Sequence, residues 1–159
     1  MRLNNRNKTG YFQFVSTLVF TTFLFGICLF LVEHFIYNYL GWSEILLLII
    51  PLILLMIFIV RGRQIFEYDS DGEALNFKNK NVVLFLNKAL SDEFPKYKLK
   101  KFEVVNALIF RRLFISISSK KTNVIILKYD ISYLSKKELN DLKLSLNKVI
   151  KQNKEREHR

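Results

Sequence analysis

The sequence predicts an α+β protein with a membrane anchor: a transmembrane helical hairpin, then an antiparallel β-sheet or barrel that a C-terminal amphipathic helix closes. Three observations lead to this prediction. Two long segments, 9–32 and 45–60, contain no charged residue. Short stretches that alternate between apolar and polar residues begin at residue 65, and a helix start signal later precedes a stripe of leucines. These patterns are typical of membrane spans, strands and an amphipathic helix, respectively.

Charge is segregated along the chain. The 159 residues have a formal net charge of +11, although half of them are hydrophobic. Of the 25 Lys and Arg residues, 22 lie in 61–159, together with 12 of the 14 acidic residues. The chain therefore divides into an apolar N-terminal part and a basic part of about one modest domain. The single cysteine, Cys28, excludes a disulfide within one chain.

The first 60 residues are expected to form a short tail, 1–10, and a transmembrane hairpin, 11–60. Its first span covers about 11–32, a helix of roughly 33 Å that is long enough for a hydrocarbon core. The second covers about 43–60 and contains Pro51, which membrane helices tolerate with a kink. A cleaved signal peptide is the alternative for the first span, but the apolar run is long for one and no A-x-A-like site follows it.

Basic residues predict which side of the membrane each end of the chain faces. Three precede the first span, Arg61 and Arg63 follow the second, and the connecting segment 33–44 has none. Because Lys and Arg stay on the cytoplasmic side, both termini are expected in the cytoplasm of a multi-pass protein of the bacterial inner membrane. Small residues on the first span allow close approach of another helix, either the second span or a second copy of the chain. These residues are Thr17, Thr21, Thr22 and Gly26.

The cytoplasmic domain, 61–152, is expected to begin with a β-hairpin. Phe66 and Tyr68 alternate with Glu67, and Asp71-Gly72 is a favoured turn pair before a second alternating stretch. Residues 81–89 predict a third, more buried strand. Residues 90–96 predict a loop, punctuated by a proline.

A further strand is expected to start at Tyr97, where Tyr97 and Leu99 alternate with Lys98 and Lys100. The alternation then slips by one residue at Lys101, which predicts a β-bulge or a bend between two strands. Two more strands are expected at 113–119 and 124–131.

A helix at about 136–152 is expected to close the domain. Ser135 and Glu138 have the spacing of a capping box. The apolar residues that follow lie on one helical stripe. They are Leu139, Leu142, Leu146, Val149 and Ile150. The last residues, 153–159, include no apolar side chain and are expected to fray.

The order of strands and closing helix over 97–150 resembles the pleckstrin-homology-like domains of bacterial membrane proteins, the YcxB-like group, in which one or two helix pairs precede such a domain. The resemblance is one of organisation, and it supplies no catalytic or ligand-binding residues to carry over. It implies a scaffolding or binding module.

Known catalytic motifs do not occur in the chain. It contains no P-loop, no G-x-G-x-x-G, no G-x-S-x-G and no H-E-x-x-H sequence. The acidic turn at 69–72 matches part of an EF-hand loop, but Lys78 stands where the loop needs a bidentate glutamate, so a plain turn is favoured. We therefore expect no enzymatic activity, no metal and no cofactor.

Basic residues around the predicted strands and turns form the candidate surface for contact with lipid or a partner. They are Lys98, Lys100, Lys101, Arg111, Arg112, Lys120 and Lys121. One interpretation is a solvated surface that also prevents sheet aggregation. The other is contact with anionic headgroups, to which each nearby charge contributes about 1 kcal/mol. Nucleic acid is disfavoured, because the aromatic residues fall at core positions rather than among the basic ones.

The sequence thus predicts a non-enzymatic, membrane-tethered binding or scaffolding module, whose pleckstrin-homology-like domain contacts a protein partner or anionic lipid headgroups. The alternative is an accessory subunit that docks onto a larger membrane complex through its transmembrane helices.

Overall fold

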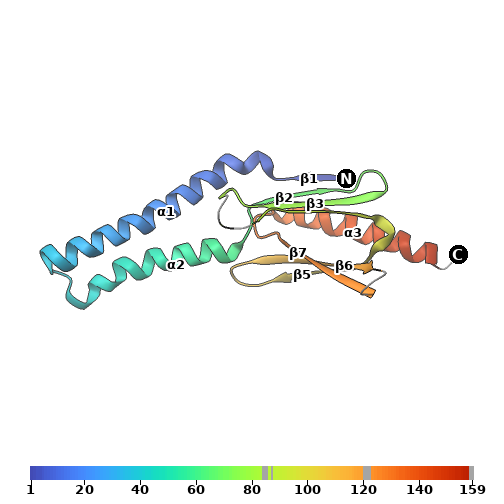
Figure 1. Cartoon of the computed structure of the whole chain (residues 1–159). Coiled ribbons are helices and arrows are strands. Elements are labelled where there is room, and N and C mark those ends of the chain that lie inside the picture. Colours follow the sequence, from blue (N-terminus) through green and yellow to red (C-terminus); the bar gives the residue numbers. More distant parts are fainter. Residues whose placement is uncertain (84–85, 87, 120–122, 158–159) are drawn as a thin grey trace.

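Two apolar helices form a hairpin that extends from one end of a β domain (Figure 1). The computed structural model describes residues 1–83, 86, 88–119 and 123–157. Helix α1 is Thr9–Val32 and helix α2 is Leu46–Arg61, joined through a π-helical turn, Glu33–Tyr37, and a 3-10 turn, Gly41–Ile45. Together with the adjoining turns, the two helices form continuous segments, Arg6–Tyr37 and Gly41–Arg61, that are long and apolar enough to cross a membrane, as predicted.

The two helices approach each other closely at a glycine. A Cβ atom added to Gly26 would lie 2.6 Å from the Leu47 carbonyl oxygen and 2.7 Å from Pro51 Cγ. At Gly26, therefore, the helix that approaches α1 is α2 of the same chain. Thr17 and Thr21 lie on an exposed part of α1.

The strands form two separate antiparallel sheets, so the prediction of an α+β domain is confirmed but the closed barrel is not. The first sheet has the order β1-β2-β3-β4, and the second has the order β5-β6-β7. The bounds are β1 Arg2–Asn4, β2 Ile65–Asp69, β3 Ala74–Lys80, β4 Leu90–Pro95, β5 Leu99–Asn106, β6 Arg111–Ser119 and β7 Asn123–Asp130.

The N-terminal residues belong to the domain and are not a free tail. Strand β1 pairs with β2, with Leu3 opposite Tyr68, and Leu3 is buried in the core. The sequence analysis assigned 1–10 to a tail because three residues are too few to show an alternation. One consequence is that the chain enters α1 from the sheet to which it returns after α2.

The strand predicted at 81–89 is wrong for the residues that the structure describes there, 81–83, 86, 88 and 89, which lie in turns and irregular backbone. Strand β4 lies instead in the segment predicted as a loop. It is an edge strand on which Phe94 is the one fully buried side chain, opposite Leu75 of β3. Its mostly polar residues and terminal Pro95 suit a sheet edge and hide the strand from an analysis of hydrophobic pattern.

The predicted slip at Lys101 is confirmed as a register shift between Leu99 and Lys101 in the pairing of β5 with β6. The extra residue leaves both Lys100 and Lys101 exposed while Phe102 turns towards the core. The strand begins later than predicted, however. Residues 96–98 form a 3-10 turn, so Tyr97 is exposed and Lys98 is half-buried.

Helix α3, Lys136–Glu157, covers the core and runs five residues further than predicted. Its capping box is formed, since the Glu138 backbone N–H donates to Ser135 Oγ and the Ser135 N–H donates to Glu138 Oε2. Leu142 and Leu146 are fully buried. Near the end of the helix, Asn153 Nδ2 donates to the carbonyl oxygens of Lys96 and Leu99, which holds a segment predicted to fray.

Candidate functional site at the helix–sheet junction

A tight turn at Gly62 joins α2 to the sheets. Gly62 has φ 77° and ψ −152°, a conformation that only glycine adopts readily. A Cβ atom at this position would lie 2.5 Å from Cγ of Asp130. The residue after the helix must therefore be glycine for two reasons, its backbone geometry and its closeness to the Asp130 carboxylate.

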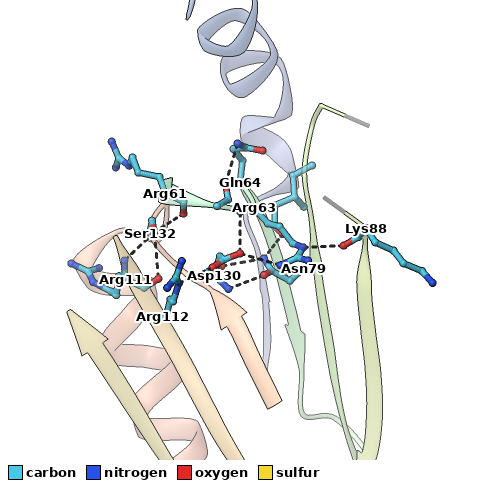
Figure 2. A network of polar contacts seen from close by, with 11 residues as sticks. Arg61, Arg63, Gln64, Asn79, Lys88, Arg111, Arg112, Asp130 and Ser132 are labelled. Carbon is cyan, nitrogen blue, oxygen red and sulfur yellow. Dashed lines mark hydrogen bonds and ion pairs between the residues drawn. The ribbon is translucent and has the colours of Figure 1, made fainter. Parts of the chain in front are cut away.

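The buried carboxylate of Asp130 is the centre of the junction (Figure 2). Its Oδ2 accepts hydrogen bonds from the Arg63 backbone N–H at 3.3 Å and from the Arg63 guanidinium at 3.1 Å. Its Oδ1 faces Nε of Arg112 at 3.4 Å. Asp130 thus links the segment after α2 to strand β6, and its charge is compensated by two arginines, as burial of a carboxylate requires.

The Asn79 side chain extends this link to the first sheet. Its Nδ2 donates to the carbonyl oxygens of Ile65 and Asp130, and its Oδ1 accepts the Asp130 backbone N–H at 2.8 Å. The amide therefore pairs with β7 as a neighbouring strand would. Asn79 is fully buried, so these bonds also satisfy groups that water does not reach.

A second contact between the sheets comes from Tyr129. Its hydroxyl donates to Oδ2 of Asp92 at 2.8 Å, which joins β7 to β4. Burial raises the pKa of Tyr129 well above its ordinary value, and the neighbouring Asp92 carboxylate raises it further. The phenol therefore stays protonated as a donor.

The segment before α1 is bound to the same place by the Asn5 side chain, and the Gln64 side chain extends the network to Val82. Asn5 Nδ2 donates to the Gln64 carbonyl oxygen, and Asn5 Oδ1 accepts the Phe66 backbone N–H, both at 2.8 Å. Gln64 Oε1 accepts the Val82 backbone N–H at 3.0 Å. Because Asn5 and Gln64 are both buried, the entry to α1 and the exit from α2 are held to each other as well as to the sheet.

Ser132 connects the end of α2 to the base of the β5–β6 turn. Its hydroxyl donates to the Arg61 carbonyl oxygen at 2.8 Å and accepts the Arg111 backbone N–H at 3.0 Å. The Arg61 side chain points away from this network in Figure 2. Its guanidinium carbon lies 4.7 Å from the centre of the Tyr133 ring.

An apolar crevice of about 290 Å³ lies between α1 and α2 beside this ring. Phe12 of α1 contacts Tyr133 edge-on, with 5.2 Å between ring centres. Burial raises the pKa of Tyr133, with Arg61 acting in the opposite direction. Lys8 lies in the 3-10 turn Arg6–Lys8 that precedes α1, and its Nζ lies 3.2 Å from Oε1 of Glu138, so this turn contacts α3.

The structure divides the predicted basic residues into two groups. Arg111 and Arg112 lie at the end of the domain that carries the helices; Arg112 faces Asp130, and Arg111 Nε donates to Asn106. Lys100 and Lys101 lie near the opposite end of β5, four to six strand positions from the residues that pair with Arg111 and Arg112, which is roughly 13–20 Å at about 3.3 Å per residue. Lys98 precedes them, half-buried, and Lys120 and Lys121 lie outside the described residues.

The junction is not predicted from the sequence. Asn79 and Asp130 are single polar residues at strand ends, where their neighbours give no sign of burial. The signal in the sequence that indicates the site is Gly62 between two arginines, directly after an apolar helix.

Every side chain named above in the junction has a partner inside the chain, so the arrangement is suited to a rigid connection. Within the described residues, no group of three His, Cys, Asp or Glu side chains could hold a metal ion.

The helical hairpin, the two sheets and the polar junction define a small α+β protein with an apolar helical stem. No family model, curated protein or solved structure matches the chain.

Proposed function

We propose that this chain is a membrane-tethered binding module, with α1 and α2 crossing the bacterial inner membrane and the β domain held at its cytoplasmic face. The junction carries the proposal. It joins the entry of α1 and the exit of α2 to the sheets through buried hydrogen bonds and ion pairs, so the apolar stem and the domain are expected to move as one body. Only 11% of the apolar window of each helix is buried, whereas a core helix of a water-soluble protein would be mostly covered.

The arrangement of basic residues supports the orientation. Arg61 and Arg63 stand where α2 meets the domain, and the connection from 33 to 44 has no Lys or Arg. Because β1 pairs with β2, the residues before α1 and those after α2 share one side of any membrane that the hairpin crosses. The positive-inside rule assigns that side to the cytoplasm.

Removal of α1 as a cleaved signal peptide fits the contacts poorly. Cleavage after the first span would also remove β1, with its buried Leu3, and Asn5, which is bonded to Gln64 and Phe66. An integral first helix preserves all of these contacts.

The partner that fits the domain best is an acidic protein surface. Lys100 and Lys101 are exposed at the end of the domain opposite to the helices. With the stem in the bilayer, they point into the cytoplasm and away from the headgroups, which disfavours the lipid contact first considered for them. A scaffolding role without enzymatic activity remains part of this proposal. So does a pleckstrin-homology-like domain, which is supported by the order of the six described strands after α2 and the one closing helix.

Cysteine labelling in intact cells tests the membrane topology. In a Cys28→Ala background, we expect Tyr39→Cys to react with a membrane-impermeant thiol reagent, because Tyr39 is 89% exposed in the connection between the helices. Asn140→Cys, on the exposed face of α3, is expected to react only after lysis. Labelling of Asn140→Cys in intact cells without labelling of Tyr39→Cys would reverse the proposed orientation.

Co-purification from gently solubilised membranes tests the partner. Lys100→Glu with Lys101→Glu is expected to release a bound acidic protein, whereas Lys137→Glu, an exposed lysine at the start of α3, is expected to retain it. The exposed Thr17 and Thr21 favour one further function, that of an accessory subunit. An integral partner that survives the lysine changes and is lost on Thr17→Leu with Thr21→Leu would support that function instead.

A further inference from the structure

The turn between β5 and β6, residues 107–110, presents apolar side chains to the surroundings. Leu108 is fully exposed and Ile109 is 42% exposed. The turn is well formed, since the Ala107 backbone N–H donates to the Phe110 carbonyl oxygen at 2.9 Å. A leucine at the tip of a solvent-facing turn buries nothing within the chain, and polar turn residues would serve there equally well.

The position of this turn is fixed relative to α2. Ser132 donates to the Arg61 carbonyl oxygen and accepts the Arg111 backbone N–H, so the strand that leaves the turn is one side chain away from the last residue of α2. Arg61, Leu108 and Ile109 line one small hollow of about 130 Å³. Figure 1 shows the β5–β6 turn at the end of the domain from which the helices extend.

We propose that the β5–β6 turn is a second membrane contact, in which Leu108 and Ile109 enter the boundary between headgroups and acyl chains. This inference rests on the proposed membrane-spanning hairpin. The apolar tip contacts the same bilayer that surrounds α2, because the tip lies beside the end of that helix. Apolar side chains of interfacial elements enter this boundary by about 5–10 Å.

The charges around the tip fit a lipid surface. Arg61 follows the apolar part of α2 and Arg111 follows the turn, and both residues line the same small hollow as Leu108 and Ile109. Arginine at this depth extends to phosphate groups while its aliphatic part remains among apolar atoms. The asparagine beside Arg111, Asn106, accepts from its Nε at 2.8 Å and leaves the other guanidinium nitrogens for phosphate.

Contact at the turn would add a third attachment to those of α1 and α2. Two helices alone allow the stem and the domain to tilt together in the membrane, whereas a third contact outside the line of the helices restrains that tilt. The turn would thereby hold the distal lysines, Lys100 and Lys101, away from the headgroups and towards a cytoplasmic partner.

Spin labels on the full chain in liposomes that contain anionic phospholipid test the proposal. In the Cys28→Ala background, a nitroxide is placed at Leu108, with references at Leu24, an exposed residue of α1, and at Leu144, an exposed residue of α3. The measured quantity is the ratio of accessibility to oxygen over accessibility to a water-soluble nickel chelate. We expect the ratio at position 108 to be several times higher than the ratio at 144 and to be lipid-like, as at position 24.

The outcomes separate this inference from the proposed function. A lipid-like ratio at 24 with a water-like ratio at 108 overturns the membrane contact and leaves the spanning hairpin intact. A water-like ratio at 24 overturns both. As a second measurement, a label at Ile109 is expected to become water-accessible on Leu108→Asp and to stay unchanged on Leu144→Asp. If Leu108→Asp has no effect on it, the apolar tip does not hold the turn in the membrane.

Discussion

Replacement of Gly62 by alanine tests the central contact of the junction. The added methyl group would lie 2.5–2.8 Å from the carboxylate atoms of Asp130, below any ordinary contact distance. Gly62 also has φ 77° and ψ −152°, which alanine adopts only under strain. Alanine must therefore change the backbone of the turn, displace the carboxylate, or both.

The expected loss follows from these two effects. Strain in this region costs about 1–3 kcal/mol for a residue other than glycine. Displacement of Asp130 weakens its bonds to Arg63 and Arg112, and a hydrogen bond to a charged group contributes about 1.5–3 kcal/mol. The sum is about 4 kcal/mol, a large part of the roughly 5–15 kcal/mol that stabilises a folded domain.

Pulse proteolysis of the full chain in detergent micelles, over a series of urea concentrations, measures this loss. With a denaturant dependence of about 2 kcal/mol per molar urea, Gly62→Ala is expected to lower the unfolding midpoint by about 2 M. Gly72→Ala is the matched control, because Gly72 has φ 70° but nothing within 4 Å of its added methyl group. It is expected to cost about 1–2 kcal/mol from backbone strain alone. Equal midpoints for the two variants would refute the role assigned to the Asp130 contact.

Three further predictions use the same assay. Leu146→Ala is expected to cost about 2–5 kcal/mol, because Leu146 is fully buried, whereas Leu144→Ala, 68% exposed on the same helix, should leave the midpoint unchanged. Burial alone would raise the pKa of Glu138, but hydrogen bonds from Ser135 and Lys8 hold this pKa below its ordinary value. The Glu138 carboxylate therefore stabilises the fold above about pH 4–5, and this stability is lost as the pH falls through the lowered pKa. Glu138→Gln should reduce the acid dependence of the unfolding midpoint. Because the pKa of Tyr129 is raised in the folded state, stability is expected to fall as the pH rises above about 10, where the phenol of the unfolded chain ionises. If the unfolding midpoint of Tyr129→Phe depended on alkaline pH as that of the unchanged chain does, this prediction would be contradicted.

Local patterns were sufficient for most of the helices and for one hairpin. The apolar segments, the capping box at Ser135 and the turn at Gly72 each depend on residues within one or two turns of the backbone, which the sequence displays directly. The bulge before Phe102 was predicted for the same reason, since a slip in a two-residue period is visible in a single strand.

Strands without a hydrophobic pattern could not be predicted in this way. Strand β1 has three residues, and β4 carries mainly polar side chains at a sheet edge. Both are strands because β2 and β3 offer unpaired backbone groups on either side. The described apolar residues Val82, Val83 and Leu86 gave the opposite error, since their spacing alone does not distinguish a strand from a turn or irregular backbone.

The sequence by itself determined that this protein has two membrane-compatible helices, antiparallel strands and an amphipathic closing helix, because each depends on the periodicity of side chains close together in the chain. Only the tertiary structure decided how these parts are joined. Asp130 meets Arg63 across 67 positions, and Asn5 meets Gln64 across 59. The same fold also separated Arg111 from Lys100 and brought Leu108 beside Arg61. Contacts of this kind depend on which strands pair and on which faces pack together. Two single side chains that lie far apart in the sequence produce no periodic pattern from which their contact could be predicted.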